Sequence, residues 1–289
     1  MSPQIPQTPD DATYSLPKAI FSTLTYAYFF LVFLMLGAFQ LNLSHNFSSV
    51  KDSVIFDLSV DFGKIDSSDS SDSVDGSPPL DDIASRIVVN TVMLGIFALH
   101  HSVFARRTIK DILINKLYIP ADIERTIYVL VASVLAHVSM IYWNTYPEEK
   151  TLWGKIDSDF VTYLGVMFGM LFVLSSTFMI DHFDLFGLRQ GLHLWSTNNE
   201  LKTIGFYKVI RHPIMTGFLI MFWCRPVLTF SSLQWNLLTT GYILIGTTIE
   251  EYCLIQEIGQ PYVEYKSQTG GLFPGCPFGI PTEMARRLM

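Results

Sequence analysis

Two groups of charged residues near the end of the sequence have types and a spacing that could do chemistry. Arg211-His212-Pro213 stands directly before an apolar stretch, and Glu250-Glu251 closes the next apolar stretch. Proline is well tolerated at the first position of a helix, so we expect a helix to begin at Pro213. The free N–H groups of that helix end, together with Arg211 and His212, would form an anion site. The alternative interpretation is a basic flank that anchors a helix end.

The acidic pair ends its apolar helix at the terminus where the helix dipole favours cations. Acids at a membrane boundary are functional candidates, and a solvated helix end is the alternative interpretation. Two helices joined by a short turn would bring the basic and acidic groups to one side of a membrane. S-adenosylmethionine suits such a dipolar site, because it carries a carboxylate, an ammonium and a sulfonium. Tyr262 and Tyr265 would cover the pocket as a lid or lie in an aromatic belt.

A third polar segment follows another apolar stretch and combines acids, an imidazole and a guanidinium. Its polar members are Asp181, His182, Arg189 and Gln190. An imidazole that titrates near neutral pH, next to a cation, could favour a thiolate nucleophile. The alternative is an amphipathic turn whose aromatic residues lie among lipid headgroups.

Histidines invite a rival hypothesis, a membrane di-iron oxidase. Five of the seven fall on one predicted side of the membrane: His100, His101, His182, His193 and His212. A di-iron centre needs more ligands, at HxxxH and HxxHH spacings, and this sequence does not have them. The three cysteines have no paired metal spacing either. We therefore expect no metal site.

Composition places the chain among membrane proteins. Of 289 residues, 49% are hydrophobic and 16% are charged, whereas a soluble domain carries about 25% charged residues. Residues 42–85 hold nine Asp and two Lys, which account for the whole net charge of −7. The rest of the chain is balanced, so charge predicts no nucleic-acid partner.

Apolar stretches predict an all-α polytopic protein with about six transmembrane helices, since a span needs about 20 residues. The expected spans are 19–41, 83–104, 125–146, 159–180, 213–230 and 234–250. The last two would form an antiparallel hairpin that turns around Ser231-Ser232. Gly165 and Gly169 form a small-xxx-small pair for close helix packing.

The distribution of Lys and Arg predicts that both termini and the charged corners face the cytoplasm. The expected organisation is a cytoplasmic tail (1–18), the first span, a disordered Ser/Asp-rich lumenal loop (42–82), a core (83–275) and a C-terminal tail (276–289).

Four motifs resemble a known family. Gly205-Phe206-Tyr207-Lys208-Val209-Ile210-Arg211-His212-Pro213, followed by Gly217, resembles the RHPxYxG signature of isoprenylcysteine carboxyl methyltransferase-like membrane enzymes. Glu250-Glu251-Tyr252-Cys253-Leu254 resembles their EExxL element. The stretches 99–106 and 181–190 are similar to the nurim and methanethiol S-methyltransferase branch. The resemblance covers about residues 85–275. Met215 departs from it, because the motif usually has tyrosine there.

The resemblance implies S-adenosylmethionine bound at the cytoplasmic face and methyl transfer to a small thiol, with methanethiol becoming dimethyl sulfide. Carried over by position, the cofactor residues are Arg211, His212, Pro213, Glu250 and Glu251. The lid interpretation adds Tyr262 and Tyr265 to the expected cofactor site. Asp181, His182, Arg189 and Gln190 would form the substrate side. The alternatives are a nurim-like protein without enzymatic activity and a methyltransferase for a lipid-linked thiol or carboxylate. The expected location is the endoplasmic reticulum or nuclear envelope, with membrane lipids as partners.

Overall fold

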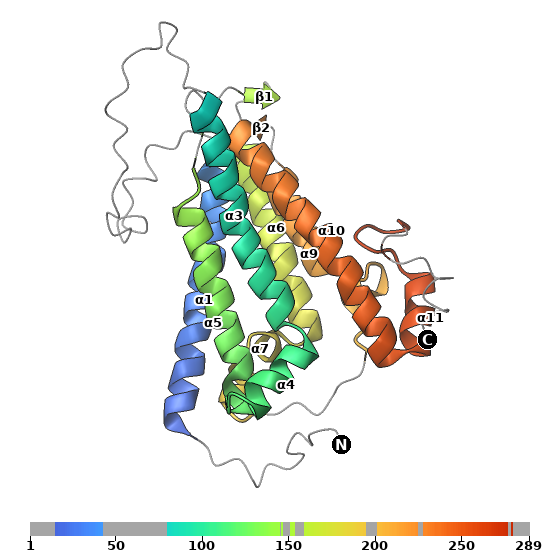
Figure 1. The fold of residues 1–289 in the computed structure, drawn as a ribbon. Coiled ribbons are helices and arrows are strands. Elements are labelled where there is room, and N and C mark those ends of the chain that lie inside the picture. Colours follow the sequence, from blue (N-terminus) through green and yellow to red (C-terminus); the bar gives the residue numbers. More distant parts are fainter. Residues whose placement is uncertain are drawn as a thin grey trace, which may run out of the picture.

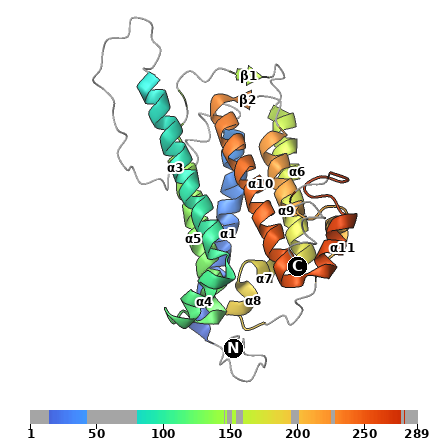
Figure 2. The ribbon, with the colours of Figure 1, turned by 45° about the vertical axis from the view of Figure 1, so that its right-hand side comes forward.

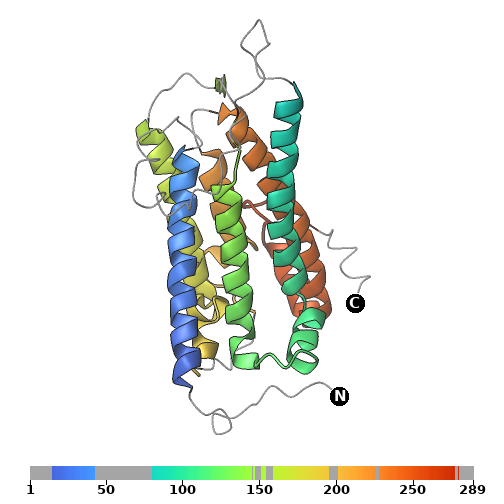
Figure 3. The same ribbon diagram turned by 60° about the vertical axis from the view of Figure 1, so that its left-hand side comes forward.

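The computed structural model describes residues 15–42, 80–144, 146, 151–153, 159–194, 201–224, 228–276 and 279. Most of the predicted N-terminal tail, acidic loop and C-terminal tail therefore lies outside the described residues. Five long helices make up the bundle in Figure 1: α1 (Leu16–Asn42), α3 (Leu80–Phe104), α5 (Ala121–Ile141), α6 (Asp159–Ile180) and α10 (Phe230–Ile258). Figure 3 shows α1, α5 and α3 side by side along one face.

Short elements gather at one end of the bundle, which we call the α11 end. They are α4 (Arg107–Asn115), α7 (His182–Leu185), α8 (Leu188–Gly191), the 3₁₀ turn η2 (Gly205–Lys208) and α11 (Gln260–Gln268). Figures 1 and 2 show α4, α7 and α11 at that end. Two short antiparallel strands, β1 (Thr151–Trp153) and β2 (Leu228–Thr229), lie at the opposite end. All of the predicted site residues fall at or near the α11 end.

Four helices are long and apolar enough to cross a membrane: Leu16–Leu41, Ile83–Phe104, Ala121–Ile141 and Tyr163–Ile180. Large apolar side chains stand exposed on their outer faces, among them Leu24, Leu99 and Phe168. In water such continuous apolar surface is unfavourable, whereas lipid tails solvate it. The chain is thus a mostly helical membrane protein, consistent with the predicted all-α class, and these four helices match the first four predicted spans.

The fifth predicted span, 213–230, is longer than the helix found there. Helix α9 (Pro213–Trp223) has 11 residues and so reaches about 16 Å, roughly half of a hydrocarbon core. It begins at Pro213, as predicted, and ends ahead of Pro226, which cannot donate a helical hydrogen bond.

Helix α10 has 29 residues and is long enough to span, although it does not meet the apolarity that marks the other four. Its start also differs from the prediction. Ser231 and Ser232 lie in its first turn and not in the connecting loop, because Thr229 and Ser232 form a capping box. The Ser232 N–H donates to Oγ1 of Thr229 (3.2 Å), and the Thr229 N–H donates to Oγ of Ser232 (2.9 Å).

The predicted hairpin of the last two apolar helices is confirmed. Nδ2 of Asn236 donates to the Phe222 carbonyl at 3.0 Å, and Nε1 of Trp223 donates to Oγ1 of Thr240 at 2.9 Å. Both contacts join the end of α9 to the first half of α10, so the two helices run antiparallel, as Figure 2 shows.

Close packing of α6 on α9 confirms the predicted role of the glycine pair. A Cβ atom at Gly169 would lie 2.5 Å from the backbone nitrogen of Met221, and one at Gly165 would collide with the Cys224 carbonyl. From the other side, a Cβ at Gly217 would lie 2.9 Å from the Val173 nitrogen. Only glycine allows the two backbones this approach, and it fixes where α9, and therefore His212, stands.

Candidate active site

The basic and acidic groups predicted from the sequence meet at the α11 end. Nε of Arg211 lies 2.6 Å from Oε1 of Glu251, although 40 residues separate them in the chain. Nε2 of His212 lies 3.3 Å from the same oxygen, and its Nδ1 lies 3.5 Å from Oε2 of Glu250. The predicted convergence of the two corners is therefore present in the structure.

Backbone hydrogen bonds hold the basic segment in place from the C-terminal side. The Arg211 N–H donates to the Gly270 carbonyl (2.9 Å), and the His212 N–H donates to the Gly271 carbonyl (3.2 Å). Ile210 and Gly270 form a parallel bridge. The residues after α11 therefore act as a strap across the start of α9.

Lys266 is a member of this site that the sequence reasoning missed. Its Nζ donates to Oε2 of Glu251, and its carbonyl accepts from Nη1 of Arg211 at 3.2 Å. Tyr262, Val263 and Lys266 are the buried residues of α11. Their spacing of one and then three residues is a helical signal that could have placed Lys266 on the inner face.

Arg211, His212, Glu251 and Lys266 form a buried charged cluster. Its balance of opposite charges keeps these side chains ionised despite their burial. The side chain of Glu251 is 0% exposed, that of Arg211 is 2% and that of Lys266 is 3% exposed. Burial alone would raise the pKa of Glu251, but hydrogen bonds from His212 and Lys266 and the charges of Arg211 and Lys266 lower this pKa to about 2. Burial would lower the pKa of His212, and the two carboxylates outweigh it and raise this pKa above its ordinary value.

Glu250 differs from its neighbour in exposure. Its side chain is 53% exposed, while the His212 side chain beside it is 5% exposed. Glu250 is consequently the carboxylate that a ligand can reach, whereas Glu251 serves the protein's own cations.

The two predicted lid tyrosines are held inside the fold. Tyr265 donates its hydroxyl hydrogen to the Tyr207 carbonyl at 2.6 Å and so ties α11 to η2. Tyr262 is 1% exposed, and its hydroxyl has no hydrogen-bond partner among the described residues. A buried hydroxyl without a partner is costly, so this atom is a natural contact for a ligand.

The segment predicted for the substrate side folds into the short helices α7 and α8. Asp181 caps α7 by accepting from the Asp184 N–H (3.2 Å) and also pairs with Nε of Arg189 (3.1 Å). Nε2 of Gln190 donates to Oδ1 of Asp184 at 3.0 Å. These polar groups mainly satisfy one another.

His182 is buried and uses both ring nitrogens. Nε2 lies 2.7 Å from the Tyr26 hydroxyl, and Nδ1 lies 2.8 Å from Oγ1 of Thr177. Its ring stacks on Phe178 at 4.2 Å between centroids. These contacts fasten α7 to α1 and α6, and they leave His182 without a nitrogen for a ligand.

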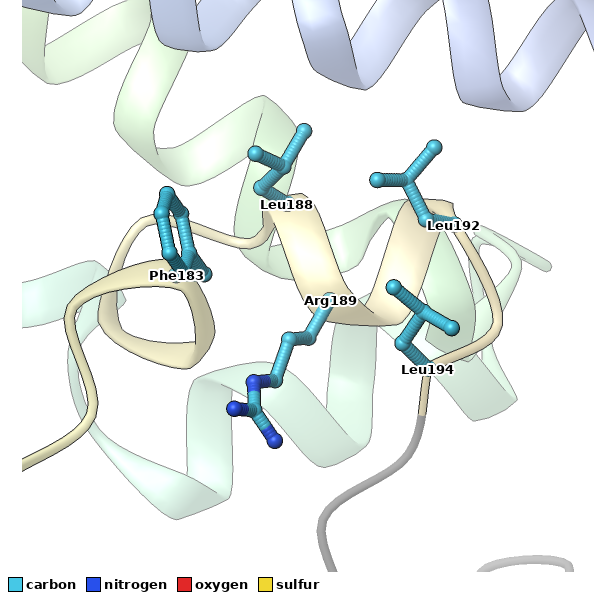
Figure 4. A pocket seen from close by; sticks show the side chains of 5 residues that line it. All are labelled: Phe183, Leu188, Arg189, Leu192 and Leu194. Atoms are coloured by element: carbon cyan, nitrogen blue, oxygen red, sulfur yellow. The ribbon is translucent and has the colours of Figure 1, made fainter.

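A pocket of about 460 Å³ opens beside this segment, and Figure 4 shows the side chains that line it. They are Phe183, Leu188, Arg189, Leu192 and Leu194. Four of the five are apolar, so the pocket suits a small apolar molecule, with Arg189 as its single charged side chain. Among the described residues, no group of three or more His, Cys, Asp or Glu is placed to hold a metal ion.

The chain has relatives among characterised proteins. The chain is 38% identical over 199 residues to methanethiol S-methyltransferase of Mycobacterium tuberculosis, covering 66% of this chain and 80% of that protein. It is 38% identical over 197 residues to methanethiol S-methyltransferase 1 of Bradyrhizobium diazoefficiens, covering 66% and 68%. More distantly, it is 24% identical over 154 residues to nurim of Xenopus laevis, covering 49% and 53%. No family model and no solved structure matches the chain. These relatives confirm the resemblance read from the motifs, and the chain belongs to the methanethiol S-methyltransferase family.

Proposed function

We propose that this protein is a membrane methyltransferase that transfers the methyl group of S-adenosylmethionine to methanethiol, or to a similarly small thiol, and forms dimethyl sulfide. The names of its relatives support the reaction. The observation that carries the proposal is the meeting of His212 with Glu250 and Glu251 at the end of the bundle. A scaffold protein has no need of such charges beside a membrane, since burying them costs free energy.

The residues at this point fit the chemistry of the cofactor. Glu250 offers an exposed carboxylate for an ammonium or for ribose hydroxyls, and His212 holds this carboxylate from its buried side. Tyr262 offers a hydroxyl that lacks a partner among the described residues. Bound there, S-adenosylmethionine supplies a methyl group made electrophilic by its sulfonium.

Arg211 and Glu251 then have a positioning role in the cofactor site. Both are saturated by protein contacts and buried, so they hold the start of α9 against the end of α10. Pro213 fixes the first turn of α9 and Tyr265 fixes α11, which keeps His212 and Tyr262 in place. Rigid placement of two reactants can lower a barrier by about 7–11 kcal/mol at its upper range.

The pocket beside Arg189 gives the small thiol a route from the membrane surface. Its apolar lining suits methanethiol, and Arg189, which Asp181 holds by an ion pair, is its charged side chain. His182 positions the wall of the pocket through Tyr26 and Thr177. We place the α11 end in the cytoplasm, because Arg106, Lys110 and Lys208 lie there, and we keep the endoplasmic reticulum or nuclear envelope as the proposed membrane.

Two substitutions test the cofactor site. We expect Glu250→Gln and His212→Ala to abolish binding of labelled S-adenosylmethionine by the purified protein, while insertion into membranes is unchanged. Glu264→Gln is the matched control, because Glu264 is an exposed acid on α11. Parental binding by both site variants would refute the location of the site. A parent that binds the cofactor but makes no dimethyl sulfide from methanethiol would favour a lipid-linked acceptor, and one that does neither would favour a non-enzymatic protein.

A further inference from the structure

A histidine–tyrosine pair between α3 and α5 lies close to the proposed cofactor site. The Tyr128 hydroxyl is 2.8 Å from Nδ1 of His101 and 3.2 Å from the His101 carbonyl oxygen. His101 belongs to the last four residues of α3, whose carbonyls have no helical N–H partner. Tyr128 therefore satisfies a carbonyl in the last turn of α3 and holds the His101 ring in place through the same hydroxyl.

The two contacts of Tyr128 decide which nitrogen of His101 carries hydrogen. The hydroxyl has one hydrogen, and a carbonyl oxygen can only accept, so that hydrogen goes to the carbonyl. The hydroxyl oxygen must then accept from Nδ1–H of His101. This assignment from the hydrogen-bond network leaves Nε2 with a lone pair, and no hydrogen bond to Nε2 occurs among the described residues.

The pair faces the same carboxylate that contacts His212. The charge of Glu250 acts on His101, Tyr128 and Tyr242. The rings of His101 and Tyr242 lie 6.3 Å apart, and the Ser102 and Tyr242 hydroxyls lie 3.3 Å apart. The second half of α10 thus passes the end of α3, and the charge of Glu250 acts on both histidines.

Three other histidines are less suited to accept a proton near Glu250. Both nitrogens of His182 are hydrogen-bonded, and both nitrogens of His212 face carboxylates. His137 also bonds a tyrosine, Tyr28, through Nδ1 at 2.8 Å. It lies nine residues beyond Tyr128 on α5, about 13 Å farther along the helix. Among His101, His137, His182 and His212, His101 is therefore the imidazole that combines an open nitrogen with the influence of the Glu250 charge.

We propose that His101 is the general base for the thiol substrate and that Tyr128 positions it. The proposal rests on the methyltransferase function above. An alkyl thiol resembles a cysteine side chain, whose pKa is about 8.5, so most of it is protonated at pH 7 and is a poor nucleophile. The thiol S–H proton passes to Nε2, the sulfur electron pair forms a bond to the methyl carbon, and the carbon–sulfonium bond breaks with its electrons going to the departing sulfur.

The test compares two thiols in the purified full-length protein. We expect His101→Asn to lower kcat for methanethiol by about 10²–10⁴, the usual contribution of a general base. Its KM for S-adenosylmethionine and its binding of the labelled cofactor stay at parental values. For trifluoroethanethiol, which is more acidic and more fully ionised at the assay pH, the loss is much smaller. Tyr128→Phe gives a partial loss with the same dependence on thiol acidity. His137→Asn is the matched control and keeps the parental ratio of the two rates.

Equal loss for both thiols, or no loss for methanethiol, would overturn the proposal while the methyltransferase function stands. If the parent methylates neither thiol, the proposed methyltransferase function is refuted, and the proposed role of His101 as a base is refuted with it.

Discussion

The carboxylate of Glu251 receives the guanidinium of Arg211 at 2.6 Å inside a cluster from which solvent is excluded. The pair joins the end of α10 to the segment before α9, and Lys266 adds a bond from α11. Removing one partner from a buried ion pair leaves a charge without compensation, which costs more than the pair contributed. The cluster should therefore govern stability as well as the shape of the cofactor site.

The first prediction follows from this burial. We expect Glu251→Gln to lower the free energy of unfolding by about 3–5 kcal/mol, because two buried cations lose their common partner. Thermal or denaturant unfolding in detergent measures the change. The control, Glu264→Gln, alters an exposed acid and should change stability by no more than about 0.5 kcal/mol. Equal stability of the two variants would contradict the buried cluster.

The second prediction concerns pH. The pKa of Glu251 is lowered from its ordinary value of 4.5 to about 2, so its contribution to stability is present in full above pH 4.5. As pH falls from 4.5 through 2, the carboxylate becomes protonated in the folded protein too, and the contribution is lost. Unfolding curves between pH 2 and pH 7 should show parent and Glu251→Gln drawing together below pH 4.5. A constant difference over this range would argue against the lowered pKa.

The third prediction concerns the approach of α6 and α9. Gly169→Ala places a methyl group 2.5 Å from the Met221 nitrogen, and Gly217→Ala places one 2.9 Å from the Val173 nitrogen. Each should cost about 1–3 kcal/mol by overpacking and weaken cofactor binding by shifting His212. Gly241→Ala is the control, because nothing lies within 4 Å of a Cβ there. Melting temperature and cofactor affinity measure both effects, and no change at Gly169 would mean that the helices stand farther apart.

The fourth prediction concerns the anchor of α7. Tyr26→Phe removes the partner of Nε2 in His182, a residue that is 3% exposed. A buried polar atom without a partner costs about 1–3 kcal/mol, so the variant should melt earlier than the parent. Tyr163→Phe removes an exposed hydroxyl from α6 and should not. If both variants melt alike, the Tyr26–His182 bond contributes nothing to stability.

Local signals explain which parts of this molecule could be predicted from its sequence. Pro213 indicates a helix start because its ring fixes the backbone angle that a first helical residue needs. Gly165 and Gly169 on α6 indicate close helix packing. The meeting of Arg211 with Glu251 followed from hairpin topology alone, because two joined helices must return to one side.

Other features depend on contacts that no local pattern encodes. The Thr229–Ser232 capping box escaped because it uses serine where glutamate is usual, while the Pro226 signal for the early end of α9 was available and was missed. Lys266 escaped because its importance comes from Glu251, which lies 15 residues away in the chain. The hydrogen bond between Tyr128 and His101 depends on how α3 is aligned along α5, and sequence periodicity does not determine that alignment.

The strap after α11 has a consequence for how the protein is made. Glu251 leaves the ribosome before Lys266, before the glycines that hold Arg211, and before Gly279, whose backbone lies against its carboxylate. A nascent chain whose spans are already in the bilayer therefore waits with Glu251 paired only to Arg211 and His212, which precede it, and without the cation of Lys266. Assembly of the α11 end becomes a late, post-insertion event, and nonsense or frameshift changes between Glu251 and Gly279 should be far more damaging than their distance from α9 suggests.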